Sequence, residues 1–374
     1  MAGIYIHIPF CKKACNYCNF HFSINQKLMP EIVSSIVKEA NLRQDYLFQK
    51  IETVYFGGGT PSLLSGNQLN FILGELHKIF SIDVSAEITL EANPDDITNE
   101  KLADWKEAGI NRLSIGIQSF FEEDLQWMNR AHNAEQALAS ISNAQKAGFE
   151  NISIDLIYGG PTLTNEHWKQ NLQIAFDFLI PHLSCYALTV EPKTILSKKI
   201  INKELSDIDH EKQANHFNHL QTFAILEGYD HYEISNLALP GKKSKHNANY
   251  WSGEHYLGLG PAAHSFNGKS RQWNVSNNSL YVTSIQQNNI PFEIEFLTIT
   301  QQLNEYIMTS LRTSDGISLN NIKLIAGESI SATVLYDSEK YILNGKMKLD
   351  SGHLILTNQG KFYADGIASD LFQL

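Results

Sequence analysis

The chain has 374 residues, of which 43% are hydrophobic and 18% are charged, and its formal net charge is −11 at pH 7. This composition is typical of a globular protein with a sizeable core, and the negative charge argues against a nucleic-acid binder, which would have a basic surface. No stretch approaches the roughly 18 consecutive apolar residues of a membrane-spanning helix, and the N-terminus lacks a signal-peptide pattern.

Strand-like runs alternate with helical patterns from the N-terminus to about residue 227. The expected strands cover residues 3–10, 53–56, 86–91, 111–117, 152–157 and 183–188. The helical patterns that follow them cover about 28–47, 66–80, 99–108, 122–147, 165–179 and 209–227. Such alternation indicates parallel βα units with right-handed crossovers. We therefore predict an α/β fold, a partial (β/α)6 TIM-like barrel that occupies residues 1–235.

The rest of the chain changes character twice. Gly, Asn, Ser and aromatic residues dominate 236–297, which we interpret as a loop-rich connector that carries some short strands. Residues 298–374 are interpreted as a small winged-helix-like domain. Its expected elements are helices at 300–311 and 319–326 and a hairpin, 347–349 to 353–356, that turns at Asp350-Ser351-Gly352. It has no marked basic stripe, which favours a protein-contact or lid function over DNA binding.

Three of the four cysteines, Cys11, Cys15 and Cys18, fall within eight residues directly after the first expected strand. Iron–sulfur clusters are normally held by four thiolates, and structural zinc takes a closed tetrahedral ligand set. Three thiols without a nearby fourth indicate a cluster with one open iron, where a small molecule can bind. The alternatives are a zinc site completed by His7 or His21, or three buried cysteines. Clustered cysteines also argue against a disulfide framework and favour a reducing, cytoplasmic location.

The CxxxCxxC spacing directly after a first strand resembles the radical S-adenosylmethionine (SAM) superfamily. In that family the open iron of a [4Fe–4S] cluster takes the amino and carboxylate groups of SAM, and an electron from the cluster cleaves the sulfonium. The resemblance implies one cluster per chain, with SAM beside the three cysteines. The protein's share of such chemistry is to hold, orient and shield the cofactor.

Polar residues gather where the expected strands end, which is where parallel βα folds bind ligands. A glycine run lets the backbone approach an amino-acid group, and Glu91 and Asp155 can accept hydrogen bonds from ribose hydroxyls or an ammonium group. Arg130 offers a fork for the methionyl carboxylate. Each residue alone would be an ordinary turn, cap or solvated charge. The expected SAM contacts are Tyr5, Gly58, Gly59, Thr60, Glu91, Gln118, Arg130 and Asp155.

A closer resemblance extends over essentially the whole chain. It rests on the segments Tyr5–Cys11, Phe56–Ser62, Leu90–Pro94, Ile115–Phe120 and Asp155–Gly159. These are similar to the HemN/HemW branch of the superfamily, which contains oxygen-independent coproporphyrinogen III dehydrogenases and haem chaperones. Phe20 stands where the dehydrogenase pattern has a further cysteine, and the first strand begins at residue 3, without the dehydrogenase's N-terminal extension. Both departures favour the chaperone type.

The segment Lys245 to Trp251 is similar to the HNxxYW segment of the chaperones, whose histidine is implicated in haem binding. His246 is therefore the candidate haem ligand, since imidazole is a good axial ligand of iron, and His255 and His264 are rivals. The aromatic residues of the segment supply flat apolar surface for a porphyrin. Lysines that could pair with the propionates are Lys242, Lys243 and Lys245.

The resemblance implies a haem chaperone that binds a [4Fe–4S] cluster, SAM and haem and transfers haem to acceptor proteins, such as respiratory enzymes. It also implies an electron donor, and peripheral membrane association through the acceptor. The alternative is a coproporphyrinogen III dehydrogenase, which would oxidise propionate groups to vinyl groups with a SAM-derived radical. The residues leave open whether the chain is an enzyme that turns over.

Overall fold

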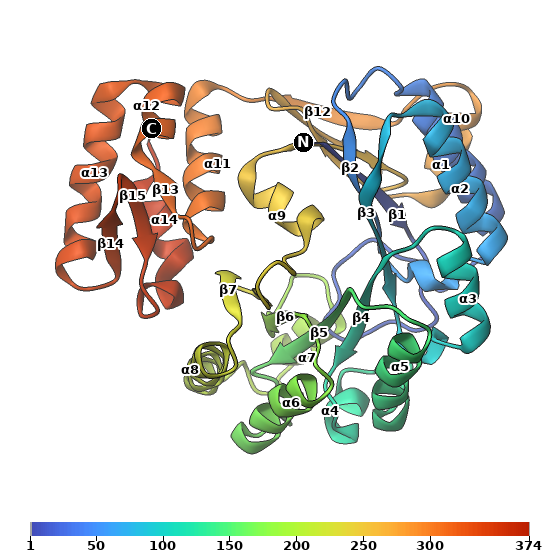
Figure 1. Ribbon diagram of the computed structural model, residues 1–374, viewed down its shortest axis with the longest axis horizontal. Helices are drawn as coiled ribbons and strands as arrows, with labels where there is room; N and C mark the ends of the chain where they lie inside the picture. Colours follow the sequence, from blue (N-terminus) through green and yellow to red (C-terminus); the bar gives the residue numbers. More distant parts are fainter. Residues whose placement is uncertain (1, 374) are drawn as a thin grey trace.

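The computed structural model describes residues 2–373 and contains the expected open barrel (Figure 1). Its parallel strands are adjacent in chain order, and each pairs with the next. They are β1 (Ala2–Ile8), β2 (Ile51–Gly58), β3 (Ile82–Ala92), β4 (Arg112–Gln118), β5 (Ile152–Tyr158) and β6 (His182–Ala187). Each strand is followed by a helix on the outer side: α1 (Met29–Leu42), α2 (Gly66–Ile79), α3 (Asn99–Glu107), α5 (Ala134–Lys146), α6 (Asn165–Asp177) and α8 (His210–Leu226). The predicted partial (β/α)6 barrel is confirmed.

The barrel strands are buried on both faces, which explains their nearly continuous apolar sequences. On β1, the alternate residues Ile4, Ile6 and Ile8 are fully buried in the main core. Ile32 and Ile36 of α1 are fully buried in the same core. The apolar period of this helix therefore marks the face that packs on the sheet.

The helical pattern predicted over 122–147 is interrupted in the structure. The short α4 (Glu122–Trp127) ends early, and Asn129 adopts a left-handed backbone with φ of 59°. Asn133 then starts α5 with a capping box that it forms with Gln136. The interruption carries Arg130 to the carboxyl ends of the strands, where it lines a cavity.

Residues 236–297 extend the barrel sheet at both edges and are not mainly a loop-rich connector. The expected short strands are present, and Leu257, Leu259 and Tyr281 are buried in the barrel core. The elements are β8 (Asn236–Ala238), α9 (Lys245–Ser252), β9 (His255–Leu259), β10 (His264–Phe266), β11 (Ser270–Asn274), α10 (Asn278–Gln286) and β12 (Phe292–Phe296). At one edge of the sheet, β9 pairs in parallel with β1 and is followed by the antiparallel strands β10 to β12. At the other edge, β8 pairs with β6 and with β7 (Asp230–Glu233).

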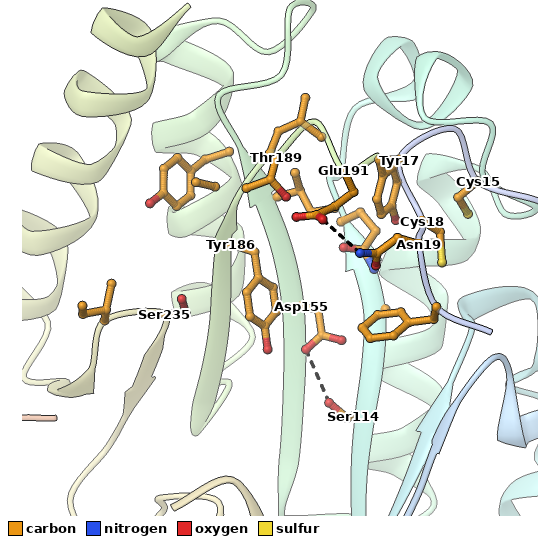
Figure 2. Close-up of a pocket in the computed structure, with 18 of the residues that line it drawn as sticks. Cys15, Tyr17, Cys18, Asn19, Ser114, Asp155, Tyr186, Thr189, Glu191 and Ser235 are labelled. Atoms are coloured by element: carbon orange, nitrogen blue, oxygen red, sulfur yellow. Dashed lines mark hydrogen bonds between the residues drawn. The ribbon is translucent and has the colours of Figure 1, made fainter. Parts of the chain in front are cut away.

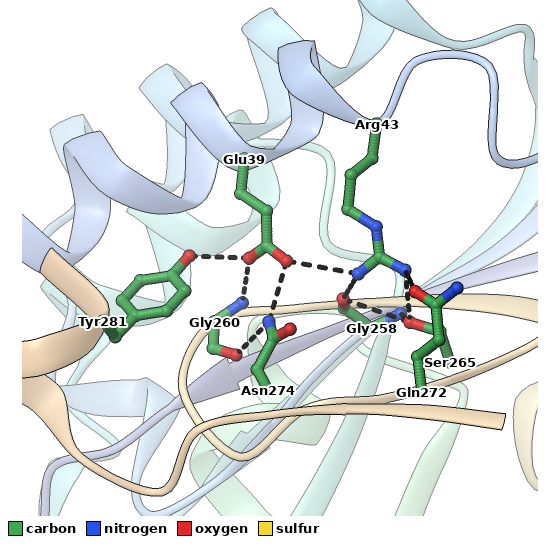
Figure 3. A network of polar contacts seen from close by, with 8 residues as sticks. All are labelled: Glu39, Arg43, Gly258, Gly260, Ser265, Gln272, Asn274 and Tyr281. Atoms are coloured by element: carbon green, nitrogen blue, oxygen red, sulfur yellow. Dashed lines mark hydrogen bonds and ion pairs between the residues drawn. The ribbon is translucent and has the colours of Figure 1, made fainter. Parts of the chain in front are cut away.

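A buried carboxylate on α1 fastens this helix to the sheet extension (Figure 3). Glu39 Oε1 accepts hydrogen bonds from Arg43 Nη1 at 3.2 Å and from Asn274 Nδ2 at 2.7 Å. Its Oε2 accepts from the Gly260 amide at 2.9 Å and from the Tyr281 hydroxyl at 2.7 Å. Because Glu39 is fully buried, these four donors replace all of its water contacts.

Arg43 continues the network on the other side of this carboxylate (Figure 3). Its guanidinium donates to the Gly258 carbonyl, to Ser265 Oγ and to Gln272 Oε1, at 2.8–3.1 Å. The loop between β9 and β10 is therefore held in place by the buried ion pair of Glu39 and Arg43 and by the hydrogen bonds that these two residues form.

The last part of the chain forms a layer with its own core at one side of the barrel (left in Figure 1). Its elements are α11 (Ile299–Leu311), β13 (Ile317–Ser318), α12 (Leu319–Ala326), α13 (Glu328–Leu343), β14 (Met347–Asp350), β15 (His353–Leu356) and α14 (Ala364–Leu371). Positive φ angles at Ser351 and Gly352 fit the predicted hairpin turn. The helix α13 was not predicted, because only Val334 and Ser338 of it are buried and its apolar period is weak. The arrangement is winged-helix-like, as expected.

Over residues 2–373, none of the helices has both the length and the apolar content that crossing a bilayer requires.

Candidate functional site

The cysteine loop, residues 11–18, leaves the carboxyl end of β1 and is tied to two neighbouring loops. Lys12 Nζ lies 2.7 Å from a carboxylate oxygen of Asp95, just after β3. The side-chain amide of Asn129 donates to the Ala14 carbonyl at 2.7 Å, from the segment after α4. These contacts curl the loop over the mouth of the barrel.

Cys11, Cys15 and Cys18 line one wall of a cavity of about 1090 Å³ at the carboxyl ends of the strands (Figure 2). All three thiols are unpaired and partly exposed, whereas Cys185 is buried in the core. The same cavity is lined by Gly58, Gly59, Thr60, Glu91, Gln118, Arg130 and Asp155. The structure thus brings the three cysteines together with every predicted SAM contact except Tyr5.

The chemistry of these thiols depends on what they bind. Burial raises the pKa of Cys11 to about 11 and also raises the pKa of Cys18, and the neighbouring thiols add to both shifts. Without a metal these two thiols are therefore neutral at pH 7. A metal centre must displace their protons, as thiolate ligation requires.

The arrangement fits a cluster better than a zinc ion. Within residues 2–373, no group of three or more His, Cys, Asp or Glu side chains surrounds a single-ion position. The thiolates of a cubane cluster bind separate irons and need not converge, whereas structural zinc requires four ligands around one ion. Both ring nitrogens of His7 are hydrogen-bonded, to the Tyr5 hydroxyl at 3.2 Å and to the His21 carbonyl at 2.9 Å. The His21 ring pairs with Asn278 at 2.7 Å.

Arg130 links the cysteine loop to two strand ends. Its Nη1 lies 3.3 Å from Cys15 Sγ, and its Nη2 donates to Asn93 Oδ1 at 2.7 Å and to the Gly116 carbonyl at 2.9 Å. Asn93 in turn donates to Thr60 Oγ1 at 3.2 Å. Arg130 therefore fixes Cys15 relative to the segment after β3 and to β4. Asn93 was not predicted, although it lies in the Leu90–Pro94 segment.

Two carboxylates form the floor of the cavity. Glu91 accepts from the Tyr55 hydroxyl at 2.8 Å and from the Gly58 amide at 3.2 Å. Burial and then the charge of Asp155 raise the pKa of Glu91 to about 7. Burial likewise raises the pKa of Asp155 to about 6, and Ser114 Oγ donates to it at 3.4 Å (Figure 2). A cationic ligand would therefore favour the ionised form of both carboxylates.

Two residues that are not glycine adopt left-handed backbone at this site. Gln118, with φ of 67°, ends β4 and lines the cavity, and Asn129, with φ of 59°, directly precedes Arg130. Each such conformation costs on the order of 1 kcal/mol or more and persists only where the surroundings enforce it. Their coincidence with the cavity supports its assignment as the functional site.

The glycine run at the end of β2 packs directly on the start of the cysteine loop. The Gly59 amide donates to the Ile8 carbonyl at 2.9 Å, and the Thr60 amide donates to the Phe10 carbonyl at 2.7 Å. A Cβ atom on Gly59 would lie only 2.6 Å from the Phe10 carbonyl oxygen. No side chain fits there without moving Phe10, and Cys11 with it.

We expect Gly59→Ala to destabilise the fold by about 1–3 kcal/mol, the usual cost of overpacking. The variant should also bind less iron than the unmodified protein on anaerobic reconstitution, because Cys11 follows Phe10. Gly74→Ala is the matched control: nothing lies within 4 Å of the added Cβ in α2, and the change should stabilise the helix by up to about 1 kcal/mol. Urea unfolding and iron content measure both effects. Equal values for the two variants would contradict the packing described.

Sequence reasoning did not identify the outer part of the cavity. Asn19 donates to Glu191 at 3.1 Å across its rim (Figure 2). The C-terminal domain contributes Arg312 and Lys361, and burial lowers the pKa of Lys361 to about 8. No local motif marks these residues, since they reach the cavity only through the packing of one domain on the other. Further lining residues that were not predicted are Tyr17, Tyr158, Tyr186, Gln213 and Phe362.

Tyr5 lies near Glu91 but is not among the residues that line the larger cavity. It lines a second cavity of about 750 Å³, and its hydroxyl is paired with His7. Its ring is roughly parallel to those of Tyr55 and His246, with centroids 6.1 and 6.4 Å away. That Tyr5 contacts SAM stays a prediction.

The candidate haem ligand His246 is buried, with 2% of its surface exposed. Its Nδ1 is hydrogen-bonded to Thr53 Oγ1 at 2.8 Å, and its Nε2 is 3.3 Å from the Tyr250 hydroxyl. The ring also stacks on Tyr55 at 4.9 Å, and burial lowers its pKa to about 3. Both ring nitrogens of His246 thus have protein partners in this structure, and its assignment as the haem ligand stays a prediction.

Comparison with known proteins agrees with the fold. Residues 5–175 match the radical SAM superfamily, and residues 297–363 match the HemN C-terminal domain. The protein named "Heme chaperone HemW" from Bacillus subtilis is 34% identical to the chain, and the match covers 98% of each. Its namesake from Mycobacterium tuberculosis is 31% identical, and the match covers 99% of this chain and 94% of that protein.

A solved structure extends the likeness to the whole fold. It is described as "Coproporphyrinogen III oxidase (HemN) from Escherichia coli is a Radical SAM enzyme", and it aligns with a TM-score of 0.85 over 100% of this chain and 90% of that one. At 21% identity this likeness shows the fold alone. From the full-length relatives, the chain belongs to the HemN/HemW branch of the radical SAM superfamily, among the HemW proteins.

Proposed function

We propose that this protein is a haem chaperone that holds one [4Fe–4S] cluster and SAM and transfers haem to acceptor proteins. The observation that carries the proposal is that three unpaired thiols share one cavity with a glycine run and two buried carboxylates. The donor set suits a cluster with an open iron, because Cys11, Cys15 and Cys18 line the cavity and the fourth cysteine of residues 2–373, Cys185, does not. The names of the full-length relatives support the haem part.

The residues around the thiols suit the parts of SAM. The cluster and SAM together supply one-electron chemistry, which the chain has to hold and shield. The backbone at Gly58 to Thr60 can approach the amino-acid part, and Glu91 and Asp155 can accept hydrogen bonds from the ammonium group or ribose hydroxyls. Arg130 already donates to three protein groups, so its main part is to fix the cysteine loop while its charge attracts the methionyl carboxylate.

The identity of residue 20, Phe20, favours a chaperone over a dehydrogenase. This residue stands where the dehydrogenase pattern has a further cysteine, and 67% of its surface is exposed on the cavity wall. An apolar ring there supplies no sulfur chemistry but does supply a flat contact surface.

Anaerobic reconstitution with iron and sulfide, followed by three assays on the same sample, tests the proposal. We expect an iron content that matches one [4Fe–4S] cluster, binding of haemin with a saturable Soret change, and transfer of that haem to apomyoglobin as a model acceptor. Protein that takes up no iron would refute the cluster. Protein with a cluster that binds no haemin would refute the chaperone function.

A coproporphyrinogen III dehydrogenase is the second candidate, and the outer wall of the cavity favours it. Arg312 and Lys361 face the same cavity as the thiols, and the Lys361 ammonium has no hydrogen-bond partner among residues 2–373. Cations there could pair with the carboxylates of a tetrapyrrole beside SAM. Formation of vinyl product from coproporphyrinogen III with SAM and a reductant would establish this activity.

We propose a reducing compartment, the cytoplasm, as the location, because a cluster with an open iron is readily oxidised. Reduction of the cluster requires an electron donor. Acceptors such as respiratory enzymes would bring the protein to the membrane surface without insertion.

We expect the affinity for SAM to fall as the pH drops below about 7. Ionised Glu91 attracts the positively charged SAM more strongly than the neutral acid does, and its pKa is about 7, so at lower pH binding must displace a proton. The Kd should rise by up to about tenfold per pH unit below 7 and level off above about pH 8. Anaerobic equilibrium dialysis of the reconstituted protein measures it. The titratable and charged groups near Glu91 are Asp155, Arg112, Cys18, Tyr5, Tyr55, Tyr186 and Tyr250.

Glu91→Gln should remove this bend in the profile and weaken binding at pH 8 by about 1.5–3 kcal/mol, roughly ten- to a hundredfold in Kd. Glu107→Gln removes a charge at the end of the outer helix α3 and should follow the unmodified protein. A profile that keeps its bend near pH 7 in Glu91→Gln would show that another group titrates.

A further inference from the structure

The second cavity lies on the other side of the segment that follows the cysteines. Asn19, Phe20 and Phe22 line both this cavity and the larger one that holds the thiols. Its volume of about 750 Å³ is within the usual range of small-molecule sites. One thin wall therefore separates it from the proposed cluster site.

Flat aromatic side chains form much of this second cavity. Phe20 is 67% exposed, and Tyr250 and Trp273 contribute further rings. The His264 ring stacks on Trp273, with ring centroids 6.2 Å apart and planes 29° from parallel. Tyr250 belongs to the segment that resembles HNxxYW, so this segment reaches the cavity through its tyrosine and not through His246. Such walls suit a large planar ligand.

Three imidazoles line the cavity, and one of them is open. His7 has both nitrogens hydrogen-bonded, and His21 is paired with Asn278 through Nε2. His264 is exposed, and neither of its ring nitrogens has a hydrogen-bond partner among residues 2–373. An imidazole nitrogen without a hydrogen-bond partner can ligate a metal ion.

The loop that carries His264 is held rigidly. Ser265 Oγ accepts from the Gly258 amide at 2.9 Å and from the buried Arg43 at 3.1 Å (Figure 3). A Cβ on Gly258 would lie 2.0 Å from the His264 carbonyl oxygen, and Ala262 has a left-handed φ of 61°. A strained, tightly packed loop that presents one unpaired imidazole is an arrangement expected of a binding site.

We propose that haem binds in this second cavity with His264 as an axial ligand of the iron. The proposal rests on the proposed haem-chaperone function and names the site at which the cargo is held. Phe20, Tyr250 and Trp273 would contact the porphyrin face and edges, and the exposed side of the cavity would leave the propionates in water. The haem would lie next to the cluster loop, across the wall formed by residues 19–22.

Haemin titration of the reconstituted full-length protein tests this assignment, because its cysteines are then occupied by the cluster. We expect His264→Ala to weaken haemin binding by at least about tenfold. Loss of a group that only supports a metal ligand already costs about tenfold or more, so loss of the ligand itself should cost no less. The variant should also lose the low-spin spectrum. Added imidazole should restore that spectrum in His264→Gly. His255→Ala is the matched control, since His255 is on the neighbouring β9 and pairs with Gln49 outside the cavity.

The outcomes separate this assignment from the proposed function. If the unmodified protein binds no haemin, both fall. If it binds haemin and His264→Ala behaves like His255→Ala, the chaperone function stands and the His264 site is refuted. If His246→Ala, with an unchanged circular dichroism spectrum, loses the Soret change while His264→Ala keeps it, the ligand is His246 and the assignment is overturned.

Discussion

Cys15→Ser is expected to abolish iron binding while it leaves the barrel folded. A serine hydroxyl does not ionise as a thiol does, so two thiolates would remain for a cluster that normally takes four. Cys15 lies in a loop and is partly exposed, so its loss should change the free energy of unfolding by no more than about 0.5 kcal/mol. Iron and acid-labile sulfide after anaerobic reconstitution, with urea unfolding of the same protein, measure the two effects.

Cys185→Ser is the matched control and should give the opposite pattern. Its thiol is 1% exposed in the barrel core, so a hydroxyl there is a buried polar group and should cost about 1–3 kcal/mol of stability. Its iron content should equal that of the unmodified protein, because it does not line the cavity of Cys11, Cys15 and Cys18. Full iron binding by Cys15→Ser, or equal loss by Cys185→Ser, would refute the three-cysteine ligand set.

The barrel could be predicted from the sequence because each βα unit has a local signal. Apolar periods and glycine breaks mark a strand and its helix within about 30 residues of each other. The interruption of 122–147 was missed because one left-handed residue, Asn129, ends a helix without disturbing the apolar period around it. The extension from β9 to β12 was missed because β9 pairs with β1, at the opposite end of the barrel sequence.

The site residues that lie at or near strand ends could be predicted from the sequence. Glu91, Gln118 and Asp155 lie on different strands, yet the rule for parallel sheets predicts that they meet, and they line one cavity. The rule says nothing of which way a side chain points deeper in a strand, so it could not show that Tyr5 lines the second cavity. A motif also cannot show whether a side chain is buried, and His246 is buried.

Glu39→Ala is expected to destabilise the protein by about 3–5 kcal/mol, the cost of breaking a buried ion pair from one side. The carboxylate accepts hydrogen bonds from Arg43, Asn274, Gly260 and Tyr281, and all four donors would lose it in a site that water does not reach. Arg43 would keep its charge with only neutral acceptors around it. Urea unfolding followed by circular dichroism measures the loss.

Glu31→Ala is the control on the same helix. Glu31 is exposed in the first turn of α1, so its removal should cost only about 0.3–1 kcal/mol through the helix dipole. Glu39→Gln keeps the shape and an acceptor but removes the charge, and should fall between the two alanine variants. Because the network also holds the loop of His264, Glu39→Gln should weaken haemin binding in the folded protein, whereas Glu31→Ala should not. Equal stability of all three variants would mean that the extension is held by its apolar core alone.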